Sequence, residues 1–145
     1  MRTRISDEFI SNRAWLREAV GDKQLILRGT SALEYLELFN GYVGEEDIYV
    51  YSLSKGLLEN IEYNVVDSFE KIDYIQHKNV LCSSLNQTVN DMLSDSLSDE
   101  QALCEALSNY YYANNECFEG LLINPVNQKR FESLKTSVIS YYKEG

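Results

Sequence analysis

Apolar and polar residues follow two different rhythms along the chain, which predict strands mainly in the first half and helices mainly in the second. Short apolar or alternating runs predict strands over Leu25–Leu27, Ile48–Tyr51, Ile61–Val66, Ile72–Ile75 and Val80–Ser83. Stretches with apolar residues every three or four positions predict helices over 6–20, 31–39, 84–93, 98–112 and 125–141. Because the strands are short and closely spaced, we expect a small mixed or antiparallel sheet flanked by helices, in the α/β (α+β) class.

Capping residues mark several of the expected helix ends. Gly29 permits a sharp turn after the first strand, and Ser31 stands three residues before Glu34, the spacing of a capping box. Asn40-Gly41 should end that helix with a left-handed residue. Ser84 with Gln87, Ser98 with Gln101, and Asn124-Pro125 are further helix starts.

The chain should form a single domain, residues 1–145, because its length and its 44% hydrophobic content are typical of one globular unit. We divide it into an N-terminal helix or arm (1–24), an α/β core (25–93) and a helical C-terminal subdomain (94–145). The first helix runs from Ser6 to Val20; alternatively Ser11 or Asn12 caps a shorter helix, and the preceding arm could dock on a partner or on a second copy.

The charge balance bears on the choice of partner. The chain has 23 acidic and 13 basic residues, a formal net charge of −10 that opposes the field of a nucleic acid, so we expect no direct nucleic-acid binding. An acidic surface can instead speed the capture of a basic protein. The sequence contains no apolar run long enough for a membrane span and its start lacks a secretion signal, which favours a cytoplasmic location and no membrane contact.

The cysteine and histidine residues do not form a recognisable catalytic or metal-binding motif. Cys82, Cys104 and Cys117 contain no CxxC pair, and reduced thiols fit them better than a disulfide framework or a zinc site. Cys82 lies in an apolar strand, as a core residue does. His77 is the only histidine and is expected in a polar loop. We therefore expect no metal and no cofactor.

The segment from Gly29-Thr30-Ser31 through a helix to Asp47-Ile48-Tyr49 resembles the core of the nucleotidyltransferase superfamily. There a glycine turn approaches the nucleotide phosphates, and two carboxylates, two residues apart on the next strand, bind divalent metal. The chain has Asp47 but carries Tyr49 at the second position, and a neutral phenol cannot replace a carboxylate as a magnesium ligand. We expect a degenerate core without enzyme activity, unless Glu62 or Asp73 restores a metal site.

A second resemblance covers about Leu25 to Leu93. The glycine-to-Leu38 segment, the strands, and Val80–Ser84 leading into a helix with Thr88 and Asp91 are similar to the effector domain of AbiEi-like antitoxins. These belong to abortive-infection, type IV toxin–antitoxin modules, and the resemblance implies an antitoxin whose protein partner is a nucleotidyltransferase toxin. Family members usually carry a winged-helix DNA-binding domain ahead of this region. The stretch before Leu25 is too short for one, so operator binding is not expected.

These considerations predict a binding surface around the glycine turn and the second strand. Arg28 at the helix start could hold a phosphate or form a structural ion pair. The run Tyr110 to Tyr112 cannot face inward as a whole, so at least one ring should be partly exposed, as at interfaces. The predicted binding residues are Arg28, Gly29, Thr30, Ser31, Asp47, Tyr49, Tyr51 and Tyr112. Two alternatives stay open: an acidic inhibitor of a nucleic-acid enzyme, and a residual nucleotidyltransferase.

Overall fold

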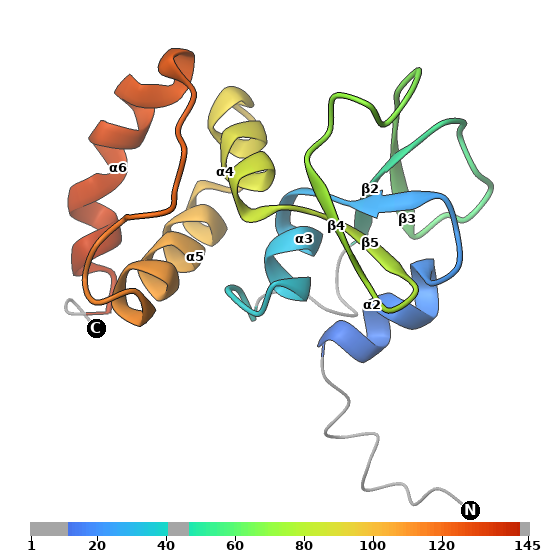
Figure 1. Cartoon of the computed structure of the whole chain (residues 1–145), viewed down its shortest axis with the longest axis horizontal. Coiled ribbons are helices and arrows are strands. Elements are labelled where there is room, and N and C mark those ends of the chain that lie inside the picture. The colour runs from blue at the N-terminus through green and yellow to red at the C-terminus, as the bar shows by residue number, and fades with distance from the viewer. Residues whose placement is uncertain (1–11, 41–46, 143–145) are drawn as a thin grey trace, which may run out of the picture.

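The computed structural model describes residues 12–40 and 47–142. Within them, five strands form one sheet, with α2 and α3 against it and α4, α5 and α6 gathered beside it (Figure 1). This arrangement confirms the expected α+β fold. The elements are α2 (Asn12–Val20), β1 (Leu25–Leu27), α3 (Gly29–Tyr35), β2 (Ile48–Ser52), β3 (Ile61–Val65), β4 (Tyr74–His77), β5 (Val80–Ser83), α4 (Leu85–Ser94), α5 (Glu100–Ala113), the 3-10 turn η1 (Pro125–Asn127) and α6 (Gln128–Ser140).

The sheet is mixed, with strand order β3-β2-β1-β5-β4. β1 lies at its centre, antiparallel to β2 and parallel to β5, and β4 is antiparallel to β5. β2 and β3 run parallel although no helix connects them, which the close spacing of these strands had argued against. The connection over 53–60 suffices because a five-residue strand is only about 17 Å long, a span that eight extended residues cover.

The strand expected at Ile72–Ile75 lies two residues later, as β4. A two-residue hairpin turn, Lys78-Asn79, pairs His77 with Val80 and so fixes the register of β4 on β5. Lys78 takes the left-handed conformation that such a turn requires (φ 56°). The hairpin, which the apolar pattern alone does not reveal, therefore decides which residues pair.

The start of α3 differs from the predicted capping box. Arg28 is the cap residue, and Gly29 turns the chain into the helix with φ +56°. Ser31 therefore lies inside the helix. Its hydroxyl accepts a hydrogen bond from the backbone N–H of Tyr49 (2.9 Å) and so links the helix to β2. The side chain is committed to a tertiary contact that local spacing could not show.

The end of α3 also differs: the helix stops at Tyr35, before the expected stop at Asn40-Gly41, of which Gly41 lies outside the described residues. Glu37 adopts φ 64°, its N–H donates to the carbonyl of Glu34 (3.0 Å), and the N–H of Leu38 donates to that of Leu33 (3.0 Å). This is a Schellman motif with glutamate in place of the usual glycine. Arg13 pairs with Glu37 at 2.9 Å and holds it there.

The later helices begin close to the predicted residues. Ser84 caps α4 by accepting from the N–H of Gln87 (3.1 Å), as predicted. The cap of α5 is Asp99, which accepts from Ala102 N–H (3.0 Å), and not Ser98. Pro125 begins η1, which leads into α6. The predicted N-terminal helix is seen from Asn12, and its residues 6–11 lie outside the described range.

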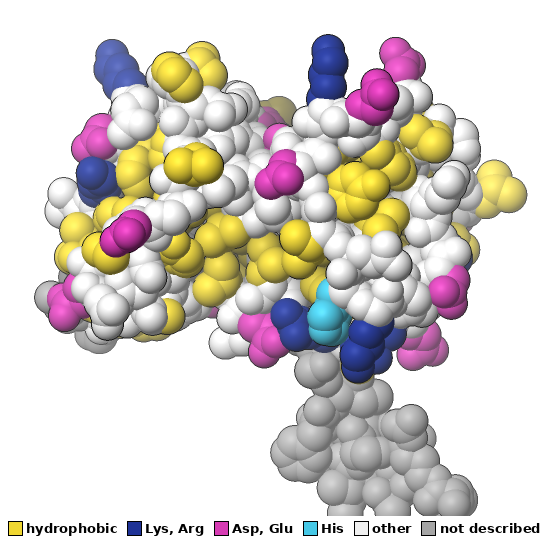
Figure 2. Space-filling view, viewed as in Figure 1, with side chains coloured by type: hydrophobic (Ala, Val, Ile, Leu, Met, Phe, Trp, Pro, Cys, Tyr) yellow, Lys and Arg dark blue, Asp and Glu magenta, His cyan; other side chains and the backbone are white. Residues whose placement is uncertain are grey.

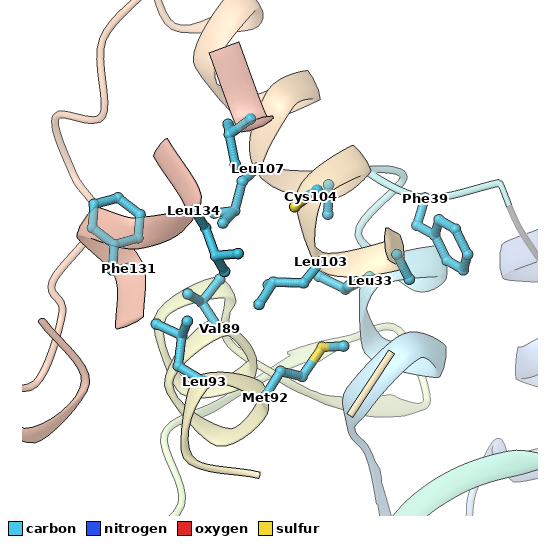
Figure 3. Packing of buried hydrophobic residues seen from close by; sticks show 13 residues of the cluster. Leu33, Phe39, Val89, Met92, Leu93, Leu103, Cys104, Leu107, Phe131 and Leu134 are labelled. Atoms are coloured by element: carbon cyan, nitrogen blue, oxygen red, sulfur yellow. The ribbon is translucent and has the colours of Figure 1, made fainter. Parts of the chain in front are cut away.

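Two apolar clusters form the core and meet at α3, which lies between the sheet and the helices (Figure 1). The sheet cluster joins α2, Ala32 and Tyr35 of α3, and one face of β1, β2, β3 and β5. The helical cluster joins Leu33 of α3 to Phe39 and to α4, α5 and α6, with Leu103 in its midst (Figure 3). Every residue from Thr30 to Tyr35 is buried, so α3 contributes to both clusters.

The segment 120–124 is held against α4 by amide side chains. Asn90 donates through Nδ2 to the carbonyl of Leu122 (2.8 Å) and accepts through Oδ1 from the N–H of Asn124 (2.8 Å) and from Nδ2 of Asn127 (3.0 Å). Asn86 Oδ1 accepts from the N–H of Leu122 (2.9 Å). These bonds replace the backbone partners that a sheet would supply to an extended segment.

The three cysteines differ in burial, and this predicts their reactivity. Burial raises the pKa of Cys82 to about 12 and also raises the pKa of Cys104, where Glu100 adds to the effect. Cys117 is partly exposed. Because the thiolate is the reacting species, we expect one thiol to react rapidly with a disulfide reagent at neutral pH and two only on unfolding. Counting released thiolate with and without denaturant checks this, and a Cys117→Ser variant should lose the rapid phase; rapid labelling of all three would contradict it.

The tyrosine run on α5 and the lengths of the helices were also subjects of prediction. Tyr110, Tyr111 and Tyr112 are all half-buried, which agrees with the prediction that the run of three cannot face inward as a whole. No helix in the residues that the structure describes is both long and apolar enough to cross a bilayer.

Candidate functional site

A cavity of about 220 Å³ opens where β1 turns into α3, beside α4 and the α4–α5 connection. We call it the Arg28 cavity. One wall comes from the glycine turn and β2, and the other from α4 and the residues that follow it. The lining residues are Arg28, Gly29, Thr30, Tyr49, Asp91, Met92, Asp95, Leu97, Ser98 and Asp99.

The backbone of Tyr49 is fixed at both ends against the turn. Its carbonyl accepts from the N–H of Arg28 (2.9 Å), and its N–H donates to the Ser31 hydroxyl (2.9 Å). At Gly29 a Cβ would stand 3.9 Å from the Cβ of Tyr49, so space alone would admit a side chain, but φ +56° strains any residue with one. The turn therefore fixes the backbone of Tyr49, a residue that lines the cavity.

Behind the wall, a polar chain joins the sheet to α4. The Arg28 guanidinium lies over the Tyr51 ring, 4.9 Å from its centroid. The Tyr51 hydroxyl donates to Oδ2 of Asp91, and Gln87 Nε2 donates to Oδ1 (2.9 Å). Gln87 also accepts through Oε1 from the N–H of Asp73 (2.9 Å). Both carboxylate oxygens of Asp91 are thus already bonded, which holds α4 against the sheet.

The electrostatics of this chain keep Tyr51 neutral. Burial raises the pKa of Tyr51, and its hydrogen bond to the Asp91 carboxylate raises that pKa further, while the Arg28 guanidinium works in the opposite direction. Tyr51 therefore remains a hydrogen-bond donor well above neutral pH. Asp91 is correspondingly an acceptor, not a proton donor, in this pair.

The outer rim of the Arg28 cavity is acidic and apolar. Asp95 accepts through Oδ1 from the N–H of Leu97 (2.9 Å), and this turn leaves the Leu97 side chain 92% exposed at the rim. Asp99 caps α5 from the same connection. Three aspartates and one arginine thus line the cavity, which suits a ligand group that is positively charged and partly apolar.

Over 12–40 and 47–142, no group of three His, Cys, Asp or Glu side chains is placed to hold a metal ion. Glu62 is exposed on the edge strand β3, and Asp73 lines a second, adjoining cavity on the far side of Asp91. Neither lines the Arg28 cavity.

The structure brings together half of the predicted binding residues. Arg28, Gly29, Thr30 and Tyr49 line the Arg28 cavity. Ser31 and Tyr51 are buried and support its wall through their hydrogen bonds. Two others lie elsewhere: Asp47 precedes β2 and is not among the lining residues, and Tyr112 donates to the carbonyl of Ile139 (2.5 Å), between α5 and α6.

The prediction of binding residues missed the second wall, which comes entirely from 91–99. Of this wall, the antitoxin resemblance indicated only Asp91, through its spacing from Thr88, and Ser98 was expected only as a helix cap. Asp91, Asp95 and Asp99 recur every four residues, but α4 ends at Ser94 and α5 begins at Glu100, so helical spacing does not place them together.

Comparison with protein-family models, with curated proteins and with solved structures finds no significant match for this chain. The resemblances to nucleotidyltransferases and to AbiEi-like antitoxins stay predictions from the sequence.

Proposed function

We propose that this protein is a non-catalytic, antitoxin-like regulatory protein that binds a protein partner at the Arg28 cavity. The observation that carries the proposal is the place of Tyr49. Where the resemblance to nucleotidyltransferases puts the second metal-binding carboxylate, a tyrosine lines the cavity, with its backbone fixed by the turn. A phenol favours contact with a side chain over coordination of a cation.

The chemistry of the cavity supports a basic partner group. Asp91, Asp95 and Asp99 outnumber Arg28, whose guanidinium already lies over the Tyr51 ring. The whole chain carries a net charge of −10, which would attract a basic surface from a distance. Met92 and the exposed Leu97 add apolar contact beside the carboxylates. An arginine or lysine side chain of the partner, with its apolar stem, fits this combination.

The identity of the partner follows from the antitoxin resemblance, which implies a nucleotidyltransferase toxin. A tagged chain purified from its native host should carry such a protein, identified by mass spectrometry, and should restore growth to cells that express it. A toxin gene beside the gene for this chain would add to the support.

Exchange of one exposed leucine tests the surface. Leu97→Asn should weaken the partner complex about fivefold or more, because an exposed apolar side chain beside a pocket is a typical anchor. Leu57→Asn is the matched control, since Leu57 is 99% exposed and lies outside the Arg28 cavity. Both variants should keep wild-type stability within about 0.5 kcal/mol. The dissociation constants are measured by calorimetry with the purified partner.

Equal affinity of the two leucine variants would place the contact elsewhere on the molecule. Another result would contradict the proposal altogether. It is the observation of binding heat and catalytic turnover when the protein is mixed with magnesium and a nucleoside triphosphate. That outcome would reinstate a nucleotidyltransferase.

A further inference from the structure

A cationic patch lies beside the sheet, where α2 meets the β4–β5 turn. It surrounds His77, and Figure 2 shows this single histidine in cyan between dark-blue lysine and arginine side chains. The charges that act on His77 come from Arg13 and Arg17 of α2, from Lys78 in the turn and from Glu37 after α3. On a chain of net charge −10, such a gathering of positive charge is unexpected.

The His77 ring is oriented by a buried hydroxyl. Tyr35, which is fully buried, places its hydroxyl oxygen 2.6 Å from Nδ1 of His77. Burial and the nearby charges of Arg13, Lys78 and Arg17 lower the pKa of His77, so the ring is neutral near pH 7. We assign the Tyr35 hydroxyl as the donor and Nδ1 as the acceptor of this hydrogen bond, because Nδ1 is much nearer than the His77 carbonyl oxygen (3.5 Å). With that assignment the neutral ring carries its proton on Nε2, and His77 presents an N–H donor on the edge of the ring opposite Tyr35.

Arg13 already has partners. Its Nε donates to the carbonyl of Tyr35 (2.7 Å), its guanidinium lies 5.1 Å from the centroid of the Tyr35 ring, and it pairs with Glu37. Arg17 and Lys78 differ, because no carboxylate or hydrogen-bond acceptor in 12–40 or 47–142 engages either side chain. Two cations therefore lie near the His77 ring with no carboxylate of the described residues paired to either of them, since Glu37 pairs with Arg13.

We propose that Arg17, Lys78 and the Nε2–H of His77 bind a compact phosphate-type dianion, either free phosphate or the phosphate of a monoester. Three donors from α2, β4 and the turn match the several acceptor oxygens of such a group. The anion would also relieve the repulsion among the like charges. An extended polyanion does not fit, because Glu37 and Asp22, which accepts from Asn79 (3.1 Å), flank the patch and the rest of the chain repels it. This inference is independent of the proposed function.

The single histidine gives a direct probe of this site. We would follow the His77 ring signals by NMR while adding sodium phosphate at constant ionic strength, with sodium chloride as the reference. We expect a saturable shift with a Kd on the order of 1–10 mM and a rise in the pKa of His77 on binding. Adenosine monophosphate forms a second arm: tighter binding than phosphate assigns the site to a monoester, and equal binding assigns it to the phosphate group alone.

Variants separate the patch from general charge effects. Arg17→Gln and Lys78→Asn should each weaken phosphate binding about fivefold, as loss of one charged contact does. Lys78→Asn keeps the fold because asparagine tolerates the left-handed turn. Lys129→Gln, on the exposed side of α6, removes the same charge elsewhere and should leave binding unchanged. No saturable shift up to about 50 mM phosphate, or equal binding in all three variants, would overturn the proposal.

Discussion

We expect Leu103→Ala to lower the free energy of unfolding by about 3–4 kcal/mol. Leu103 is 0% exposed and lies in the helical cluster near Leu33, Val89 and Met92 (Figure 3). Truncation removes apolar atoms and leaves a cavity. The surrounding helices α3, α4, α5 and α6 are packed on several sides and can close it only in part. The cost is therefore the lost transfer free energy together with the lost packing contacts.

Denaturant unfolding followed by circular dichroism measures this change in stability. Leu57→Ala is the matched control, because the same atoms are removed from a side chain that is 99% exposed. It should change stability by no more than about 0.5 kcal/mol. Similar values for the two variants would mean that the helical cluster is not packed as described.

Asn90→Ala should lower the free energy of unfolding by about 2–4 kcal/mol, through polar groups instead of apolar ones. The substitution leaves the carbonyl of Leu122, the N–H of Asn124 and the Nδ2 group of Asn127 without their bonds to this side chain. Asn90 and Asn127 are both buried, so water replaces these bonds poorly.

A substitution that keeps the shape of the side chain separates the contribution of these hydrogen bonds from that of packing. Asn90→Asp keeps the volume but places an acceptor against the carbonyl of Leu122, so it should also be destabilised. Asn64→Ala, on the exposed side of β3, is the control and should have little effect. Denaturation midpoints compare the four proteins. A stable Asn90→Asp variant would show that the side chain serves only to fill space.

The sequence predicts most of the elements because their apolar patterns report burial directly. α4, α5 and α6 follow their apolar stripes, and β1, β2 and β5 follow their apolar runs. The predictions are wrong where a contact between residues far apart in the sequence determines the local structure. Ser31 bonds to β2 instead of capping α3, and β4 takes its register from a hairpin turn. Neither contact is visible in the spacing of residues along the chain.

The Arg28 cavity was half predictable for the same reason. Its first wall follows the glycine turn, a local feature with a clear signature. Most of its second wall comes from the polar string after α4, which has the composition of any connecting loop. Only the packing of α4 against α5 brings Asp95 and Leu97 opposite Tyr49. Tyr112 was predicted to lie at an interface. Its position on α5 instead directs its hydroxyl to the carbonyl of Ile139 in α6.

The buried position of α3 governs how the molecule can be divided. Because Leu33 belongs to one apolar cluster while Ala32 and Tyr35 belong to the other, a fragment that ends before α4 would expose Leu33 to water, and a fragment that starts there would lack it. The sheet and the helices therefore share α3 as a common part of their cores. Neither half is a suitable piece to express by itself.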